Sequence, residues 1–295
     1  MKKLLSFALV CVCMLVCSLA QAQKPLLDSA SLAQKPFFIS LKEARKTPLE
    51  VYKLDLHEGT PTTIPQEVFK FSNLMELFMS YNTDLTIIPP EIAQLQNLKV
   101  LGLSHSKQMT NLPKEIGKLV GLETLSLYGN KKLTTLPVEI GQLKNLKILQ
   151  LTSCDSFSTL PKEIGDLSSL KELHLYDNNE LTNIPKEIGQ LKNLRVFNLV
   201  ACGKVTIFLE IISSLANLEE LNLSGTLTST SLPKEICQLK KLKKLGLTYC
   251  KNLTTLSKEI GNLTNLKELD LSGSNISKAE KANIKKMLPN CKIIE

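Results

Sequence analysis

One pattern is repeated along most of this chain and constrains its fold more than any other feature. Segments of the form Leu-x-x-Leu-x-Leu, or with another apolar residue in one place, recur every 24 residues; they begin at residues 74, 98, 122, 146, 170, 194, 218, 242 and 266. A related segment begins at Val51, and most units continue with a phrase like the Leu-Pro-Lys-Glu-Ile-Gly-Lys-Leu of residues 112–119. Ten consecutive units therefore cover residues 51–276, which predicts a stack of repeated coils.

The spacing of the apolar residues within one unit predicts its local structure. In a strand Leu101 and Leu103 point to one side and Gly102 to the other. Proline is tolerated where a helical turn begins, and Ile116 and Leu119 then face inward together. We expect one short strand and one short helical or 3₁₀ segment per unit. Because one coil cannot bury its own leucines, the coils must stack.

On these motifs the chain resembles the leucine-rich-repeat family, in a bacterial variety with 24-residue units that is similar to the Ras-group and plant-type repeats. The matching units cover about three quarters of the chain. The resemblance implies a right-handed α/β solenoid shaped like a horseshoe. A parallel sheet lines the concave side of such a solenoid, and short helices or 3₁₀ turns line the convex side. It implies a binding role without naming the ligand.

In that family, the eighth position after the leading leucine carries an asparagine that bonds to the backbone of adjacent coils. Here this ladder column reads Asn82, Ser106, Asn130, Cys154, Asn178, Cys202, Thr226, Cys250 and Ser274. Its three cysteines recur at every second coil, so their Cα atoms are expected ~10 Å apart, beyond the ~7 Å limit for a disulfide. We interpret them as buried thiols. A bridge between the other two cysteines of the repeat and cap regions, Cys237 and Cys291, stays open.

The N-terminus has the pattern of a cleavable export signal. Lys2 and Lys3 precede a run of 17 mainly apolar residues, and Ala20-Gln21-Ala22 is a small-x-small cleavage motif. We expect residues 1–22 to be a signal peptide and the mature chain to contain no transmembrane segment. The protein is then expected in the periplasm, on the cell surface or outside the cell.

The segments that flank the repeats are expected to close the two ends of the stack. Residues 23–36 contain two Lys-Pro pairs and are expected to form a loose leader. A capping-box pattern that begins at Ser40 predicts a cap helix within residues 37–50, and another that begins at Ser277 predicts one within residues 277–295. Pro289 ends the second helix, and residues 292–294 are expected to add an edge strand.

The side chains that project from the concave sheet are the candidate ligand contacts. They form three columns: the residue between the last two leucines of each strand motif, and the two exposed residues that follow. These columns hold all three histidines and four of the five tyrosines, and aromatic side chains are favoured at binding surfaces. We predict a ligand patch at Phe78, Tyr81, His105, Tyr128, Gln150, His174, Tyr176 and Asp177, with Asn198 and Tyr249 as further contacts. The alternative is that these aromatics only stabilise the strands.

Catalytic and metal sites are not expected. His174 and Asp177 are candidates for a base and its orienting partner, with Ser126 or Ser153 as the nucleophile, but no oxyanion site is evident nearby. His57, His105 and His174 lie two and three coils apart, ~10 and ~15 Å, which is too far for one metal ion. No phosphate-binding loop or zinc motif occurs, so we expect no enzyme activity, metal or cofactor.

The charge of the chain is modest. The net charge of +8 falls to +6 without Lys2 and Lys3, and the only dense basic run is at residues 240–244, so nucleic acid is not an expected partner. We expect an exported, monomeric recognition module for a protein or glycan. The alternative is a structural or adhesive envelope protein without a discrete ligand site.

One coil departs from the pattern, because Phe208-Leu209-Glu210-Ile211-Ile212 replaces the Leu-Pro phrase. This segment is either a degenerate coil or a second, apolar contact surface on the outer side.

Overall fold

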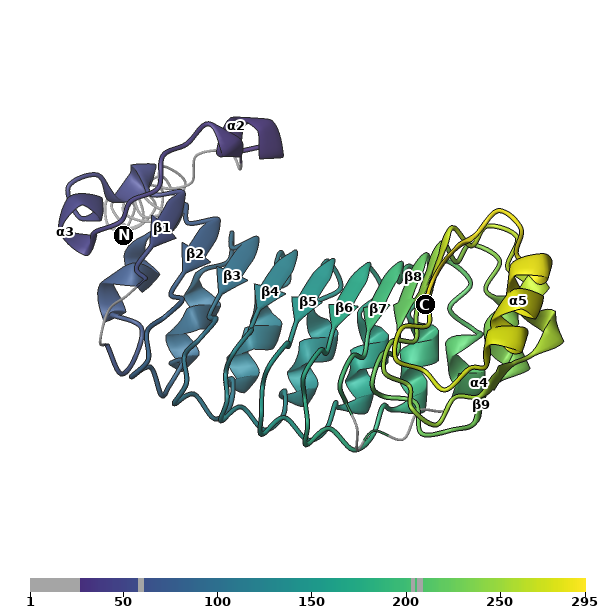
Figure 1. The fold of residues 1–295 in the computed structure, drawn as a ribbon. Coiled ribbons are helices and arrows are strands. Elements are labelled where there is room, and N and C mark those ends of the chain that lie inside the picture. Colours follow the sequence, from purple (N-terminus) through teal and green to yellow (C-terminus); the bar gives the residue numbers. More distant parts are fainter. Residues whose placement is uncertain (1–26, 58–60, 203–204, 206–208) are drawn as a thin grey trace, which may run out of the picture.

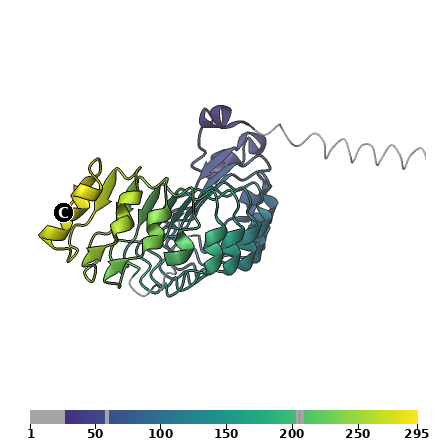
Figure 2. The same ribbon diagram turned by 90° about the vertical axis from the view of Figure 1, so that its right-hand side faces the viewer.

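The structure, a computed structural model, describes residues 27–57, 61–202, 205 and 209–295. The chain forms a curved stack of coils with a sheet along the concave side and short helices along the convex side (Figure 1). Turning the molecule shows these helices following one another along the outside of the stack (Figure 2). The predicted α/β solenoid is therefore confirmed.

Eleven parallel strands of the described residues form one sheet, in the order β1-β2-β3-β4-β5-β6-β7-β8-β10-β12-β13. The pairing follows the repeat, so Leu101 lies beside Leu125 and Leu149 beside Leu173. The strands are β1 (Lys53–Asp55), β2 (Glu76–Phe78), β3 (Val100–Gly102), β4 (Thr124–Ser126), β5 (Ile148–Gln150), β6 (Glu172–His174), β7 (Val196–Asn198), β8 (Glu220–Asn222), β10 (Lys244–Gly246), β12 (Glu268–Asp270) and β13 (Lys292–Ile294). Two further short strands, β9 (Ser231–Leu232) and β11 (Thr255–Leu256), pair with each other elsewhere on their coils.

The convex side is built mainly from 3₁₀ helices. They are η1 (Pro48–Glu50), η2 (Gln66–Lys70), η3 (Pro90–Gln94), η4 (Lys114–Lys118), η5 (Val138–Gln142), η6 (Lys162–Asp166), η7 (Lys186–Gln190), η8 (Lys234–Gln238) and η9 (Lys258–Asn262). Helices η2–η8 each begin directly after the repeat proline, while Ser257 takes that place before η9. A Cβ at Gly165 would lie 2.4 Å from the carbonyl oxygen of Glu187. Glycine there lets neighbouring helices approach closely.

The coil that lacks the Leu-Pro phrase forms an α-helix, α4 (Leu209–Ile212), in place of a 3₁₀ helix. Leu209 occupies the position of the repeat proline and is itself the first residue of this helix, whereas the helices of the other coils begin one residue after the proline. Ile212 is buried and Ile211 packs against the core. Part of the segment that we considered as an outer contact surface therefore faces inward, whereas Phe208 lies outside the described residues.

Short helices with capping side chains lie near both ends of the stack. Ser40 caps α3 (Leu41–Ala44) and Ser277 caps α5 (Lys278–Met287), each by accepting a backbone N–H at 3.2 Å. At one end Phe38 bridges to Leu54 of β1, and at the other β13 pairs with β12.

The segment expected to be a loose leader contains a helix, α2 (Ser29–Ala33). Two local contacts hold it. The Asp28 carboxylate accepts the N–H of Ser31 at 2.7 Å, and Leu32 packs against Tyr52 and Met75 of the first coils. The prediction of a loose leader was based on the two Lys-Pro pairs. It did not take into account that Asp28 caps a helix between them and that Leu32 anchors this helix to the first coils.

The inner leucines are buried along the stack, except that Leu56 of the first coil is partly buried, and the ladder column joins the coils above them. Asn130 Nδ2 donates to the carbonyl oxygens of Leu103 at 3.1 Å and Leu127 at 2.8 Å, and its Oδ1 accepts the N–H of Ser106 at 2.8 Å. In the next coil, Cys154 Sγ donates to the same Leu127 carbonyl at 3.2 Å. The thiol of Cys154 thus donates a hydrogen bond to the backbone as the ladder asparagine does.

The cysteines of the described chain are all free thiols: Cys154, Cys202, Cys237, Cys250 and Cys291. The structure therefore contains no Cys237–Cys291 bridge. All except Cys291 are buried. Burial raises the pKa of Cys154 to about 12 and that of Cys202 to about 11.

Replacement of one inner leucine tests the stacking. Leu149→Ala is expected to lower the free energy of unfolding by ~2–5 kcal/mol, because it leaves a cavity between tightly packed coils. Urea unfolding followed by circular dichroism measures the change. The matched change Val120→Ala, at an exposed position, is expected to alter it by less than ~0.5 kcal/mol. Equal effects would contradict the assigned core.

Thiol accessibility tests the assignment of the ladder cysteines. At pH 8 a thiol reagent is expected to modify Cys291 in the folded protein, while Cys154 and Cys202 react only after unfolding, because buried thiols with raised pKa values form little thiolate. Peptide mapping by mass spectrometry identifies the modified residues. Labelling of Cys154 as fast as Cys291 in the folded state would refute the assignment.

Candidate binding face

Strand alternation places the predicted contact residues on the concave face. Phe78, Gln150, His174 and Asn198 are the last residues of β2, β5, β6 and β7, and each is partly exposed. Two residues further on, Tyr128 and Tyr176 are exposed. These six side chains lie where the sequence pattern put them, because the buried leucines on either side fix the alternation.

The third predicted column has a backbone conformation that the sequence pattern did not reveal. Among the described residues, its non-glycine members have positive φ angles between 53° and 62°: Tyr81, His105, Ser153, Asp177, Ala201 and Tyr249. Gly129, Gly225 and Gly273 occupy the same column with φ of 65–73°. The conformation turns the chain at the end of each strand while the N–H still reaches the next coil, as from Tyr81 to the carbonyl of Ser104 at 2.8 Å. A side chain at such a position costs ~1–2 kcal/mol relative to an ordinary conformation.

Three of the predicted aromatic residues are in direct ring contact. The Tyr81 ring stacks on His105 with centroids 4.5 Å apart, and His105 meets the Tyr128 ring edge-on at 4.6 Å. Tyr81 is 56% exposed and Tyr128 is 39% exposed. The rings therefore form a continuous surface that solvent reaches.

Phe37, which is not among the predicted contacts, extends this surface towards the N-terminus. Phe37 is 45% exposed, and its ring centroid lies 5.8 Å from that of Phe78. The signal was present as the alternation Phe37-Phe38-Ile39: once Phe38 pairs with Leu54, its two neighbours must face outward. We call the set Phe37, Phe78, Tyr81, His105 and Tyr128 the aromatic patch.

Glycines on the following coil make room for two rings of the aromatic patch, those of Phe78 and His105. A Cβ at Gly102 would lie 2.6 Å from Cδ1 of Phe78, and one at Gly129 would lie 2.5 Å from Nδ1 of His105. Each ring therefore leans over the next coil towards the C-terminus. The position of the ring depends on a residue 24 positions further along the chain.

The centre of the concave face is polar and internally hydrogen-bonded. Ser126 Oγ donates to Oε1 of Gln150 at 2.8 Å. Asn198 Nδ2 donates to Nδ1 of His174 at 2.9 Å, which leaves the Nε2–H of His174 to donate to the Glu172 carboxylate at 3.2 Å. These side chains present hydrogen-bonding groups in fixed orientations.

The candidate catalytic residues have separate partners. Ser153 Oγ donates to the carboxylate of Asp177 at 3.3 Å, whereas His174 bonds to Asn198 and Glu172. Nucleophile, base and orienter are therefore not linked by the hydrogen bonds of this face. Across the described residues, no three His, Cys, Asp or Glu side chains gather in a way that could hold a metal ion.

His105 and Glu123 are among the groups of the face whose pKa is shifted. Burial, together with the charge of Lys107, lowers the pKa of His105, so the ring is neutral at neutral pH, which suits its place between two tyrosines. Burial alone would raise the pKa of Glu123, but hydrogen bonds and charge from Lys147 and Lys99 outweigh it and lower the pKa.

Tyr249 lies apart from the aromatic patch. It follows β10, five strands along the sheet from Tyr128, or ~24 Å at the usual strand spacing. It is 67% exposed, and its ring leans over Gly273 as His105 leans over Gly129. Tyr249 has the same positive-φ backbone conformation as Tyr81, but the residues around its ring are different.

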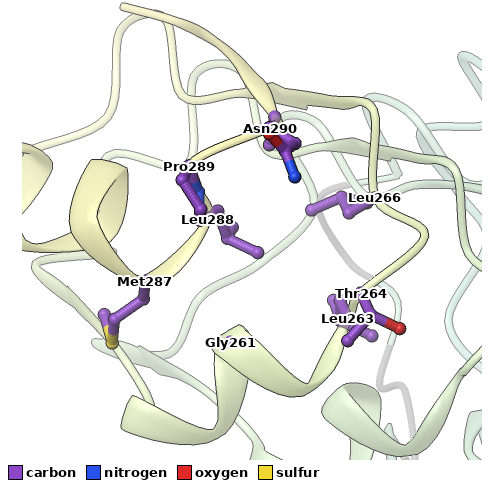
Figure 3. Close-up of a pocket in the computed structure, with 9 residues that line it drawn as sticks. Gly261, Leu263, Thr264, Leu266, Met287, Leu288, Pro289 and Asn290 are labelled. Atoms are coloured by element: carbon purple, nitrogen blue, oxygen red, sulfur yellow. The ribbon is translucent and has the colours of Figure 1, made fainter.

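A hollow of about 180 Å³ lies at the C-terminal cap, outside the three concave columns (Figure 3). Leu263 and Leu266 of the last coil line one side, and Met287 and Leu288 from the end of α5 line the other. It is a gap at the junction of cap and repeats.

Two family models match the chain. One, described as a leucine-rich repeat region, matches residues 88–231, and one described as a leucine rich repeat matches residues 50–107. The chain belongs to the leucine-rich-repeat family. The two matches together cover residues 50–231, which is more than half of the sequence.

Solved structures of leucine-rich-repeat proteins resemble it. A leucine-rich-repeat protein of Leptospira interrogans is 30% identical, over 88% of this chain and 100% of that one, with a TM-score of 0.31. The leucine-rich-repeat domain of the type III effector XopL is 22% identical over 93% and 86%, with a TM-score of 0.55. A TDR receptor is 21% identical over 88% of this chain and 50% of the receptor, with a TM-score of 0.57. The last two likenesses support the fold. No curated protein matches the chain.

In the portion that the structure describes, no helix has both the length and the apolar character that crossing a bilayer requires. The expected signal peptide, residues 1–22, lies outside that portion.

The third column, whose residues have positive φ angles, allows a direct test of backbone strain. Ala201→Gly is expected to raise the free energy of unfolding by about 0.5–1 kcal/mol, because relief of the left-handed conformation exceeds the entropic cost of glycine. Tyr81→Gly is expected to give no such gain, since it also removes the contact with His105, worth ~0.5–1.5 kcal/mol. Urea unfolding compares the two variants, and destabilisation by Ala201→Gly would rule out the strain argument.

Proposed function

We propose that this leucine-rich-repeat protein is an exported, non-catalytic recognition module that binds an extended segment of a protein partner through its concave face. The aromatic patch supplies the main contact. The observation that carries the proposal is the ring series Tyr81, His105 and Tyr128, two members of which occupy a column where the backbone favours glycine. Strained positions that hold large exposed side chains are characteristic of functional sites.

The physical properties of the aromatic patch suit a protein ligand. Tyrosine and phenylalanine bury a large area with little loss of side-chain entropy, and such residues dominate binding energy at interfaces. The sheet beneath holds the rings at fixed spacing, so little ordering is needed on binding. A curved sheet of this length fits a large, shallow ligand better than a small enclosed one.

The polar centre complements this apolar contact. Gln150, His174 and Asn198 hold hydrogen-bonding atoms beside the aromatic patch, where an extended backbone offers its own N–H and C=O groups. A glycan would use similar hydrogen bonds. Protein is favoured because the patch includes Phe37 and Phe78, which offer no hydrogen bond to a sugar.

Export is proposed from the sequence of residues 1–22, and the absence of a linked nucleophile and base on the face supports a non-catalytic role. An adhesive envelope protein is the remaining alternative. Such a protein would tolerate single concave substitutions and respond mainly to salt.

Two tyrosines in the same backbone conformation provide a matched test. The chain of residues 23–295 is used to capture partners from envelope and secreted fractions, alongside Tyr81→Ala and Tyr249→Ala variants. Tyr81→Ala is expected to weaken binding of a captured protein by about 2 kcal/mol, roughly 30-fold in Kd, while Tyr249→Ala leaves it unchanged. The Tyr128, His174 and Tyr176 triple alanine variant extends the test to the polar centre. Equal capture by all forms, with Kd governed by salt, would favour the adhesive alternative.

A further inference from the structure

A cavity of about 540 Å³ lies beneath α2, at the N-terminal end of the same concave face. Figure 1 shows α2 standing over the first strands of the sheet. Leu32 of α2 lines one side, and Met75, Val100 and Lys53 of the first three coils line the other. This volume falls within the ~300–1,000 Å³ range of ligand pockets. The three predicted columns include none of these residues.

The cavity has an apolar region that α2 creates. Leu32 packs with Tyr52 and Met75 in a small cluster that is separate from the main core, and Leu27 adds to it. Val100 lies beside Glu76 in the sheet and is partly exposed. These groups surround a space that accepts an apolar side chain.

Lys53 places a buried positive charge in the wall of the cavity. The residue is 6% exposed. Its Nζ lies 3.5 Å from the carbonyl oxygen of Ala33, 4.0 Å from a carboxylate oxygen of Glu76 and 4.9 Å from the ring centroid of Phe37. The hydrogen bond and the ion pair are at the outer limits for their kinds of contact, since a close ammonium–carboxylate pair is about 2.7–2.9 Å apart, whereas the distance to Phe37 is an ordinary cation–π distance. A buried ammonium without a close carboxylate is costly, so a carboxylate placed at the Lys53 ammonium would be held strongly.

The rim of the cavity favours a peptide over a lipid. Lys99 and Glu123 form an ion pair of 3.1 Å there, and Thr124 lies beside them. An alkyl chain would have to cross these polar groups, while a peptide backbone can hydrogen-bond to them. Phe37 touches both Lys53 and Phe78, so it connects the wall of the cavity with the aromatic patch.

We propose that this cavity binds an acidic residue and an adjacent large apolar residue of an extended peptide. The acidic side chain pairs with Lys53, and the apolar side chain enters between α2 and the strands β2 and β3. This inference rests on the proposed function, because it names the part of the partner segment that contacts the beginnings of the strands whose ends carry the aromatic patch.

Methionine methyl signals provide local reporters for the test. After removal of residues 1–22 the chain contains Met75, Met79, Met109 and Met287. Met75 lines the cavity, Met287 lines the distant hollow at the cap, and Met79 and Met109 are buried in the core. The probe is N-acetyl-Glu-Leu-amide, titrated into protein with 13C-labelled methionine methyl groups, with the Gln-Leu and Glu-Ala analogues and octanoate as comparisons. We expect a saturable shift of the Met75 signal alone, and at least fivefold weaker binding of both analogues.

Two lysines in the same register of the sheet provide matched variants. Lys53→Met is expected to weaken binding of the Glu-Leu probe at least tenfold and to abolish its preference over Gln-Leu. Lys244→Met is expected to leave both unchanged, because Lys244 lies on β10 and pairs with Glu220. If Lys53→Met does not fold, Lys53→Arg replaces it and is expected to keep the preference for Glu-Leu over Gln-Leu.

Several results would overturn the inference. They are no Met75 shift with the Glu-Leu probe, equal affinity in the wild type and Lys53→Met, loss of the preference in Lys53→Arg, or a Met75 shift with octanoate but not with the peptide. If Tyr81→Ala loses the captured partner while Met75 does not respond to the probe, only the cavity assignment fails. If Met75 responds as expected but Tyr81→Ala binds the partner normally, only the role of the aromatic patch fails.

Discussion

Hydrogen bonding from each coil to the next is the interaction on which the rest of this structure depends. No coil can satisfy its own backbone or bury its own leucines, so both tasks pass to the neighbours. The ladder side chains extend the pairing beyond the strands, as Asn130 and Cys154 do when both donate to the carbonyl of Leu127. The left-handed residues extend it further, since their N–H groups still reach the following coil. The regular columns of the concave face follow from this pairing.

Most of the fold could be predicted because each of the ten units has apolar residues at the same positions, which must be buried against neighbouring coils. The alternation around Leu101 and Leu103 fixed the strand, and the Pro-x-Glu-Ile-Gly phrase fixed the outer turn. The structure differs from the prediction where a residue that does not follow the repeat pattern changes the local secondary structure. The coil in which Leu209 replaces the proline contains α4, and Asp28 with Leu32 orders α2 in a segment for which two Lys-Pro pairs predicted a loose structure.

The candidate site was less predictable than the fold. Strand alternation placed Phe78, Gln150, His174 and Asn198 on the concave face, but it carries no information on which side chains touch. The ring contacts of His105 depend on the turn conformation and on Gly129 in the next coil. The cavity beneath α2 depends on Leu32 packing against Met75, two residues joined by no repeat and far apart in the sequence. Periodic patterns predict positions within a coil, whereas contacts made by a segment outside the repeats require the three-dimensional structure.

The leaning of rings over glycines in the next coil limits how such a chain can change length. In a stack of similar coils, gain or loss of one whole unit leaves the nearest-neighbour packing largely intact. Between β2 and β4 this freedom is lost, because an inserted coil would separate Phe78 from Gly102 or His105 from Gly129 and Tyr128. Duplication of a unit is therefore compatible with the central coils, whereas the coils that carry the aromatic patch have to be inherited as one block.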